Sequence, residues 1–273
     1  MKKNILALLV LGLSFSMAYS QKLVIKGSDT VLPLSQLEAE DFMKENPKVG
    51  ISVVGGGSGV GIAALIDKDT DIAQSSRPIK GAEKKKARAN GVDVVETSIA
   101  KDALTVIVNK KNKVSKLTFE QIEKIFTGQI TNWKDVGGDN KQIVLYSRES
   151  SSGTYTFFRE HVMSNKDYAP STLLQASTGP IVAAVSQTEG AIGYIGFAYL
   201  DNTVKALSVS SDGKNFIEPD KANVDDGTYP ITRDLLYYTN GKPKGVAKDF
   251  IDYILSPKGQ NIVEESGYMK LIK

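Results

Sequence analysis

The stretch Ser147–Thr154, with the sequence SRESSSGT, decides how this chain is organised. The apolar run Ile143–Tyr146 before it predicts a buried strand, and Tyr155–His161 after it predicts a helix. The stretch is therefore a strand-to-helix turn, where main-chain N–H groups lack intrahelical acceptors and the helix dipole is positive. Such an end binds anions, and Arg148 adds a planar guanidinium that suits an oxyanion. Taken alone, the serines are also explained as helix caps.

Three further strand-to-helix turns have the same composition. They are Gly27–Thr30 with the sequence GSDT, Gly57–Gly59 with GSG, and Ser75–Pro78 with SSRP. Together with the first stretch they offer many neutral hydroxyl and amide donors but only two cations, Arg77 and Arg148. Their glycines let the main chain approach a ligand closely. We expect these turns to bind a small, dehydrated oxyanion.

The order of the predicted elements indicates an α/β fold with mostly parallel strands, because short apolar runs alternate with helical segments. In such sheets a ligand binds beyond the carboxyl ends of the strands, which is where all four turns lie. The turns fall into two groups, within residues 27–77 and residues 148–179. We therefore expect the ligand to lie in a cleft between two lobes.

Extended runs predict where the chain crosses between the lobes. Val92–Val95 and Leu104–Asn109 predict strands, the second of which leaves the first lobe, and Tyr229–Tyr238 predicts the return. Residues 210–228 are polar and predict a loop. These crossings divide the chain as follows: residues 21–103 plus 229–273 in lobe 1, and residues 104–228 in lobe 2.

Residues 1–20 predict a signal peptide. Two lysines form a basic start, Ile5–Leu13 is an apolar segment too short to span a membrane comfortably, and Ala18–Ser20 supplies the small residues that a signal peptidase reads. We expect cleavage after Ser20 and before Gln21. The sequence contains no cysteine, which excludes lipoprotein attachment and disulfides. The mature chain is therefore expected to be exported, soluble and periplasmic.

The charge balance gives no indication of a nucleic-acid partner. The 273 residues include 34 Lys and Arg against 31 Asp and Glu, which is close to neutral. The run Lys84–Lys86 with Arg88 predicts a solvated helix face. We expect no nucleic acid and no membrane surface among the partners of this chain.

Enzymatic interpretations lack the residues they need. His161 is the only histidine, so a site rich in His or Cys for a metal is excluded, and a Ser-His-Asp triad would have to use a residue farther along the helix that Ser152 begins. The run Asp67–Asp71 predicts a polar turn. A Walker phosphate loop fails because Ile62 stands where a lysine is required. We expect no catalytic residue, no metal and no cofactor, and keep a periplasmic phosphate-ester hydrolase only as an alternative.

With these turns in this order, the sequence resembles the phosphate-binding proteins of ABC-type phosphate importers, the PstS family, over essentially the whole mature chain. The SDT and SSRP variants are similar to the shorter bacterial branch of that family. The resemblance implies a type II periplasmic-binding-protein fold: two α/β lobes with mixed, mostly parallel sheets and a two-crossover hinge. It also implies a monomer that captures inorganic phosphate and delivers it to an ABC permease in the inner membrane, without catalysis.

The turns and the resemblance together give the predicted ligand-binding residues. Thr30 and the amide of Val31 stand at the first helix end, Ser58 stands at the second, and the largest group comes from the opposite lobe. The full set is Ser28, Asp29, Thr30, Val31, Ser58, Ser76, Arg77, Arg148, Ser152, Gly153 and Thr154.

The sequence departs from the best-known family members at two positions. Ser76 occupies the position at which those members have an aspartate that accepts the proton of hydrogen phosphate. Ser150 occupies the position at which they have an aspartate near the binding arginine. That proton-accepting carboxylate rejects sulfate, which has no proton to give. Either Asp29 takes this role or discrimination is weaker, which leaves sulfate or molybdate as alternative ligands. Arg77 either adds a second cation or forms an ion pair at the rim.

Overall fold

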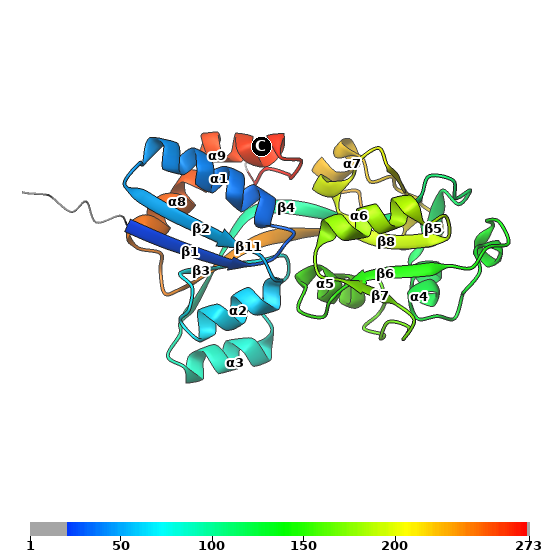
Figure 1. Ribbon diagram of the computed structural model, residues 1–273, viewed down its shortest axis with the longest axis horizontal. Helices are drawn as coiled ribbons and strands as arrows, with labels where there is room; N and C mark the ends of the chain where they lie inside the picture. Colours follow the sequence, from blue (N-terminus) through cyan, green and yellow to red (C-terminus); the bar gives the residue numbers. More distant parts are fainter. Residues whose placement is uncertain (1–20, 272–273) are drawn as a thin grey trace, which may run out of the picture.

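The structure of the protein is a computed structural model that describes residues 21–271. Two α/β lobes lie side by side and are joined by the long strands β4 (Val94–Asn109) and β11 (Thr232–Asn240), as Figure 1 shows. The signal peptide predicted for residues 1–20 lies outside the described residues. Within the described chain, no helix combines the length and the apolar composition needed to cross a membrane.

The remaining elements follow one another in an α/β order. The other strands are β1 (Gln21–Gly27), β2 (Val49–Val54), β3 (Ile72–Ser75), β5 (Lys116–Thr118), β6 (Val144–Arg148), β7 (Leu173–Gln175), β8 (Ala191–Gly196), β9 (Val204–Ala206) and β10 (Ser208–Ser210). The helices are α1 (Leu32–Glu45), α2 (Ser58–Ile66), α3 (Gly81–Ala89), α4 (Phe119–Phe126), α5 (Gly153–His161), α6 (Thr178–Gln187), α7 (Lys221–Asp225), α8 (Gly245–Leu255) and α9 (Pro257–Glu265), with 3-10 helices η1 (Trp133–Val136) and η2 (Phe197–Tyr199).

The main sheet is mixed, as the sequence predicts. Its strand order is β2-β1-β3-β11-β4-β8-β6-β7, with β9 beside β4, while β5 and β10 form a separate pair. β1 lies parallel to β2 and β3, β6 lies parallel to β7 and β8, and β11 and β4 run antiparallel to their neighbours. In Figure 1 the carboxyl ends of β1 and β6 point toward the junction of the lobes from opposite sides. The turns that follow these strands therefore meet there.

The sequence prediction is wrong about the number of strands at β4. The sequence predicts separate strands at Val92–Val95 and Leu104–Asn109, but the structure has one strand that pairs first with β11 and then, from Leu104 onward, with β8. The intervening residues do not show an apolar pattern, because they include the buried charge of Asp102. A partner from the opposite hinge strand, Arg233, pairs with that charge and lets the strand continue.

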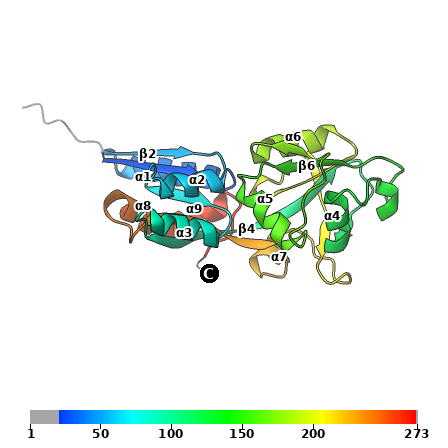
Figure 2. The same cartoon turned by 90° about the horizontal axis from the view of Figure 1, so that it is seen from below.

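Helices cover both faces of the sheet in each lobe. In lobe 1, α1, α8 and α9 bury one apolar cluster that includes the edge-to-face pair Phe42 and Phe250, and α2 and α3 bury another on the opposite face. In lobe 2, α5 and α6 lie on opposite sides of β6 in Figure 2, and each belongs to its own apolar cluster. A buried aromatic side chain of this kind contributes about 1.5–3 kcal/mol to stability. The sheet edge that faces the junction is thus held rigidly from both sides.

The segment predicted as a loop, residues 210–228, contains one short helix. α7 begins there because the side chain of Asp220 accepts a hydrogen bond from the Asn223 amide at 2.8 Å. The rest of this segment is irregular, as expected from its polar composition.

Glu38 on α1 makes the stability of the protein depend on pH. Its side chain is fully buried, and neither carboxyl oxygen has a hydrogen-bond partner within residues 21–271. Burial, helped by the nearby Asp41 and opposed by Lys258, raises the pKa of this carboxyl group to about 9. In the unfolded chain the group has its usual pKa, so the folded state binds one more proton between about pH 5 and pH 9. The free energy of unfolding therefore falls as the pH rises through this window.

We predict that Glu38→Gln stabilises the protein by about 2–4 kcal/mol at about pH 8 and by much less at about pH 4, because glutamine needs no proton to remain neutral. Urea denaturation over this pH range measures the effect. The control is Glu40→Gln, which alters an exposed residue of the same helix that pairs with Lys44. One common pH profile for wild type and both variants would contradict the prediction.

Candidate functional site

Three helix N-termini meet at the junction of the lobes. α1 and α2 come from lobe 1, and α5 comes from lobe 2. The main-chain N–H groups at these ends that make no hydrogen bond to any part of the described chain include those of Thr30, Val31, Ser58, Gly153 and Thr154. All five residues are buried. Buried N–H groups are almost always paired, so their convergence indicates a place built for an anionic acceptor.

Hydroxyl groups fill the space between these helix ends. Ser76 Oγ lies 3.0 Å from Ser28 Oγ and 3.4 Å from Ser58 Oγ, and the two threonine hydroxyls of Thr30 and Thr154 lie 2.8 Å apart across the junction. A hydroxyl group can rotate its proton toward a new acceptor and still accept a bond itself. The hydroxyls therefore satisfy one another here and can all turn toward a bound oxyanion.

Arg148 is the cation at the centre of the site. Its side chain is only 2% exposed, and it donates to the carbonyl oxygens of Gln175 and Ala176 and to Thr178 Oγ1. Its Nη2 also donates to Asp29 Oδ2 of the opposite lobe at 2.6 Å. Because a guanidinium has five N–H groups, one on Nη1 is left without an acceptor in the part of the chain that the structure describes.

Asp29 brings a carboxylate to the same point from lobe 1. Its Oδ1 accepts a hydrogen bond from the Gly56 amide at 2.9 Å, while Oδ2 accepts the bond from Arg148. The sequence predicted both residues as ligands and did not predict that they pair with each other. This ion pair connects the two lobes directly.

The lobes are in contact around the ion pair. The Gly59 amide donates to Ser151 O at 2.9 Å, and Tyr199 of lobe 2 donates to Asp29 O at 2.7 Å. A Cβ atom at Gly153 would lie 2.3 Å from Ser58 Oγ, so no larger residue fits between the lobes at this position. The structure is therefore that of a closed cleft.

Arg77 is buried beside the first turn of α2, where its Nη2 lies 3.8 Å from the position that a Cβ atom at Gly59 would take. Its guanidinium makes a bidentate ion pair with Glu83, with bonds of 2.7 and 2.9 Å, and also donates to Pro78 O. Burial by itself raises the pKa of Glu83, but the hydrogen bonds from Arg77 and the Lys80 amide, together with the charges of Arg77 and Lys80, leave that pKa below its usual value. Of the two roles considered for Arg77, the geometry corresponds to the ion pair.

Two residues under the site were missed by the sequence analysis. Arg233 on β11 and Asp102 on β4 form a fully buried ion pair with bonds of 2.8 and 3.1 Å. Arg233 also donates to Ser76 O at 3.1 Å, which holds the turn after β3 against the hinge. Arg233 lies within the predicted extended run Tyr229–Tyr238, and a charge there could have indicated a buried pair, whereas Asp102 lies between two predicted strands.

Two tyrosines were missed as well. Tyr199 donates to Asp29 O, and Tyr268 near the end of the described chain donates to Thr30 O at 2.6 Å. Neither lies near a predicted turn in the sequence, so no local pattern points to them. Both contacts are to carbonyl groups of the first ligand-binding turn.

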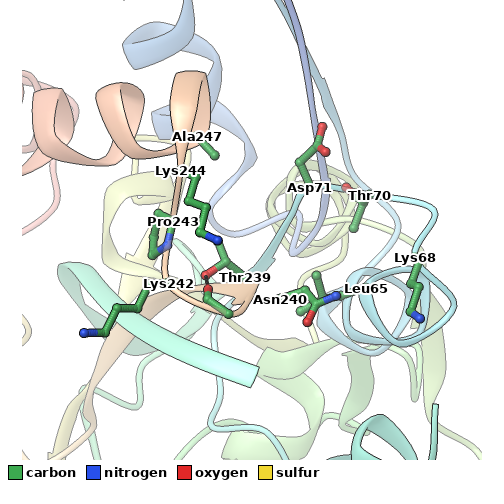
Figure 3. A pocket seen from close by; sticks show the side chains of 11 residues that line it. Leu65, Lys68, Thr70, Asp71, Thr239, Asn240, Lys242, Pro243, Lys244 and Ala247 are labelled. Atoms are coloured by element: carbon green, nitrogen blue, oxygen red, sulfur yellow. Dashed lines mark hydrogen bonds between the residues drawn. The ribbon is translucent and has the colours of Figure 1, made fainter. Parts of the chain in front are cut away.

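The rest of lobe 1 contains a hollow of about 360 Å³ far from these helix ends, between the start of β3 and the loop that leads to α8. Figure 3 shows that its lysines do not converge, because the side chains of Lys68 and Lys242 lie on opposite sides. An anion would not be enclosed there.

Side chains that could hold a metal do not gather in the described part of the chain, where no group of three or more His, Cys, Asp or Glu residues is placed for it. His161 stacks on Phe157, with its Nδ1 3.0 Å from the Phe157 carbonyl oxygen, and Ser152 Oγ caps α5 by accepting from the Tyr155 amide. His161 is thus bound to its own helix.

Known proteins resemble this chain over most of its length. The PBP superfamily domain matches residues 17–258. The phosphate-binding protein PstS of Staphylococcus saprophyticus is 38% identical over 257 residues, which cover 90% of this chain and 79% of that protein. The phosphate-binding protein PstS of Bacillus subtilis is 36% identical over 252 residues, covering 92% of this chain and 81% of that protein.

Solved structures agree with these relatives. A phosphate ABC transporter substrate-binding protein from Clostridium perfringens, solved with bound phosphate, has a TM-score of 0.84 and 36% identity and covers 92% of this chain and 100% of its own. An ABC-type phosphate transport receptor from Vibrio cholerae has a TM-score of 0.75 and 30% identity and covers 90% of this chain and 99% of its own.

We predict that Gly153→Ala prevents closure, because its Cβ would lie 2.3 Å from Ser58 Oγ and 2.7 Å from Ser76 Oγ. Small-angle X-ray scattering should give a larger radius of gyration than for the wild type. The matched control is Gly179→Ala in the first turn of α6, where nothing lies within 4 Å of an added Cβ. Equal radii for all three proteins would show that the contact at Gly153 does not limit closure.

Proposed function

The chain belongs to the PstS family of phosphate-binding proteins, and on this premise we propose that it captures inorganic phosphate at the junction of its lobes and delivers it to an ABC import permease. One observation carries the assignment of the site. Unpaired amides from three helix N-termini, two in one lobe and one in the other, lie at the junction where Arg148 of lobe 2 pairs with Asp29 of lobe 1. The proposed ligands are the predicted residues other than Arg77, which we assign to the ion pair with Glu83.

This donor set suits a small oxyanion that has lost its water. A charge-assisted hydrogen bond contributes about 1.5–3 kcal/mol, and a tetrahedral anion accepts many at once. Several such bonds leave about 8 kcal/mol after the cost of desolvation, which corresponds to micromolar binding. Neutral amides and hydroxyls supply most of these bonds, and Arg148 supplies the charge.

Binding and closure are coupled in this proposal. Thr30, Val31 and Ser58 belong to lobe 1, whereas Arg148 and Thr154 belong to lobe 2, so only the closed arrangement offers all donors together. Phosphate therefore stabilises the closed state by the difference between its affinities for the two states. In the closed structure Arg148 donates to Asp29, and a phosphate oxygen competes with Asp29 for that guanidinium.

The choice between phosphate and sulfate depends on which group accepts a proton. Ser76 can accept a bond from the P–OH group, but its hydroxyl can equally donate to sulfate. An ionised carboxylate can only accept, so it repels an anion that has no proton to give. Asp29 is the carboxylate that reaches the site, and we assign to it the proton of hydrogen phosphate.

The protein acts outside the cytoplasm, as PstS-type binding proteins do. We propose that residues 1–20 are a signal peptide cleaved after Ser20, that the mature chain is periplasmic, and that its permease lies in the inner membrane. We further propose that it works as a monomer, binds no nucleic acid and catalyses no reaction.

We predict that the wild-type chain binds phosphate in isothermal titration calorimetry and that Arg148→Ala weakens binding by at least about 100-fold, because it removes the charge and leaves Asp29 facing the anion. Arg77→Ala should weaken binding by less than about tenfold, since that guanidinium is held by Glu83. Absence of heat with the wild type would reject phosphate as the ligand, and equal effects of the two variants would reject the assignment of the site.

We predict that Asp29→Asn lowers the ratio of phosphate affinity to sulfate affinity by at least about tenfold, because the amide can donate to either anion. Competition titrations with phosphate, sulfate and molybdate measure this ratio. The variant also loses the ion pair with Arg148, but that loss affects the binding of both anions. The ratio of the phosphate affinity to the sulfate affinity therefore reports on selectivity alone. An unchanged ratio would show that Asp29 does not accept the proton of phosphate.

A further inference from the structure

Two tyrosines from outside the ligand-binding turns hold successive peptide groups of the first turn. Tyr199 donates to Asp29 O at 2.7 Å, and Tyr268 donates to Thr30 O at 2.6 Å. Tyr199 belongs to η2 of lobe 2, and Tyr268 follows α9 at the end of lobe 1. The two donors are thus separated from their acceptors by more than 160 residues of sequence.

These bonds fix the direction of two N–H groups. In a planar trans peptide the C=O and N–H of one unit point in opposite directions. When Tyr199 holds Asp29 O, the N–H of Thr30 points away from Tyr199, and when Tyr268 holds Thr30 O, the N–H of Val31 points away from Tyr268. Both N–H groups lack an acceptor in residues 21–271, and both belong to the proposed phosphate site.

Holding the carbonyls also removes an unfavourable interaction. A carbonyl oxygen that turned toward the site would place partial negative charge against an oxyanion. A hydroxyl donor on the far side keeps each carbonyl oriented away from the ligand. Burial raises the pKa of both phenols well above the ordinary value, so both remain donors throughout the physiological pH range.

We propose that Tyr199 and Tyr268 are positioning residues for phosphate binding, which orient the Thr30 and Val31 amides without touching the ligand. The inference rests on the proposed function, because it assigns those two amides to phosphate. It gives Tyr268, close to the end of the described chain, a supporting role at the binding site. A main-chain bridge between Lys101 and Met269 secures this end of the chain to the hinge strand β4.

The two tyrosines act at different stages of binding. Tyr268 and Thr30 belong to the same lobe, so their bond is present whether the cleft is open or closed, and it prepares the site before phosphate arrives. Tyr199 and Asp29 belong to different lobes, so their bond forms only on closure. Loss of the first hydroxyl therefore affects both capture and release, whereas loss of the second affects release.

The test compares three Tyr→Phe variants by stopped-flow kinetics and calorimetry with inorganic phosphate. Tyr229→Phe is the matched control, because Tyr229 is also buried and donates to a carbonyl oxygen, Leu104 O at 2.8 Å, that is not in a ligand-binding turn. We expect Tyr268→Phe and Tyr199→Phe to weaken phosphate binding about tenfold and Tyr229→Phe to change it less than about twofold. The dissociation rate should rise in both test variants, and the association rate should fall in Tyr268→Phe alone.

Either of two results would overturn the proposal: wild-type affinity in both test variants, or an equal loss of affinity in Tyr229→Phe. A general loss of stability would lower the melting temperatures of all three variants and would not produce the different rate effects. The wild-type titration is read separately and reports on phosphate binding itself. The ratio of each variant's phosphate affinity to that of the wild type reports on positioning by the tyrosines. Failure of the positioning proposal can therefore be distinguished from failure of the proposed phosphate binding.

Discussion

Unpaired main-chain N–H groups at buried helix ends are the constraint on which the rest of this protein depends. A buried donor without an acceptor costs about 1–3 kcal/mol, and Thr30, Val31, Ser58, Gly153 and Thr154 each present one at the same junction. A water-filled open cleft relieves this cost, and so does an anion in the closed one. Closure without a ligand relieves only part of it, through the hydroxyl contacts and the ion pair of Arg148 with Asp29. In the proposed function, this difference in cost is what couples phosphate binding to closure of the lobes.

The turns of the site were predictable because their chemistry is local. A serine or glycine at a strand-to-helix turn indicates a helix end from a few residues, and Arg148 lies beside one of them. The pairing of Arg77 with Glu83 is also local, since six residues separate them. In contrast, the partners of Asp102 and Thr30 are 131 and 238 residues away. Such contacts are created by strand order and hinge crossing, which apolar periodicity does not encode.

The family resemblance and the geometry bear on different questions. Membership of the PstS family supports the proposed ligand and transport system, while the positions of the side chains are the basis for proposing how this chain binds phosphate with Ser76 in place of an aspartate. A chain of serine hydroxyls occupies that place, and the carboxylate of Asp29 enters from a different turn. Beneath them, Arg233 and Asp102 connect the two hinge strands. A buried pair of this kind adds little net stability, but removal of one partner alone leaves an uncompensated buried charge in the hinge.

The position of β11 in the sheet has a consequence for the order in which the protein can fold. This strand lies between β3 and β4, so the sheet of lobe 1 stays incomplete until residue 240 is available, and Tyr268 joins later still. Contacts this distant in sequence form slowly. The central strand of this sheet is therefore supplied by a late part of the sequence, after the whole of lobe 2. The same topology that joins the two lobes thus makes the hinge and the binding site depend on the last segments of the described chain.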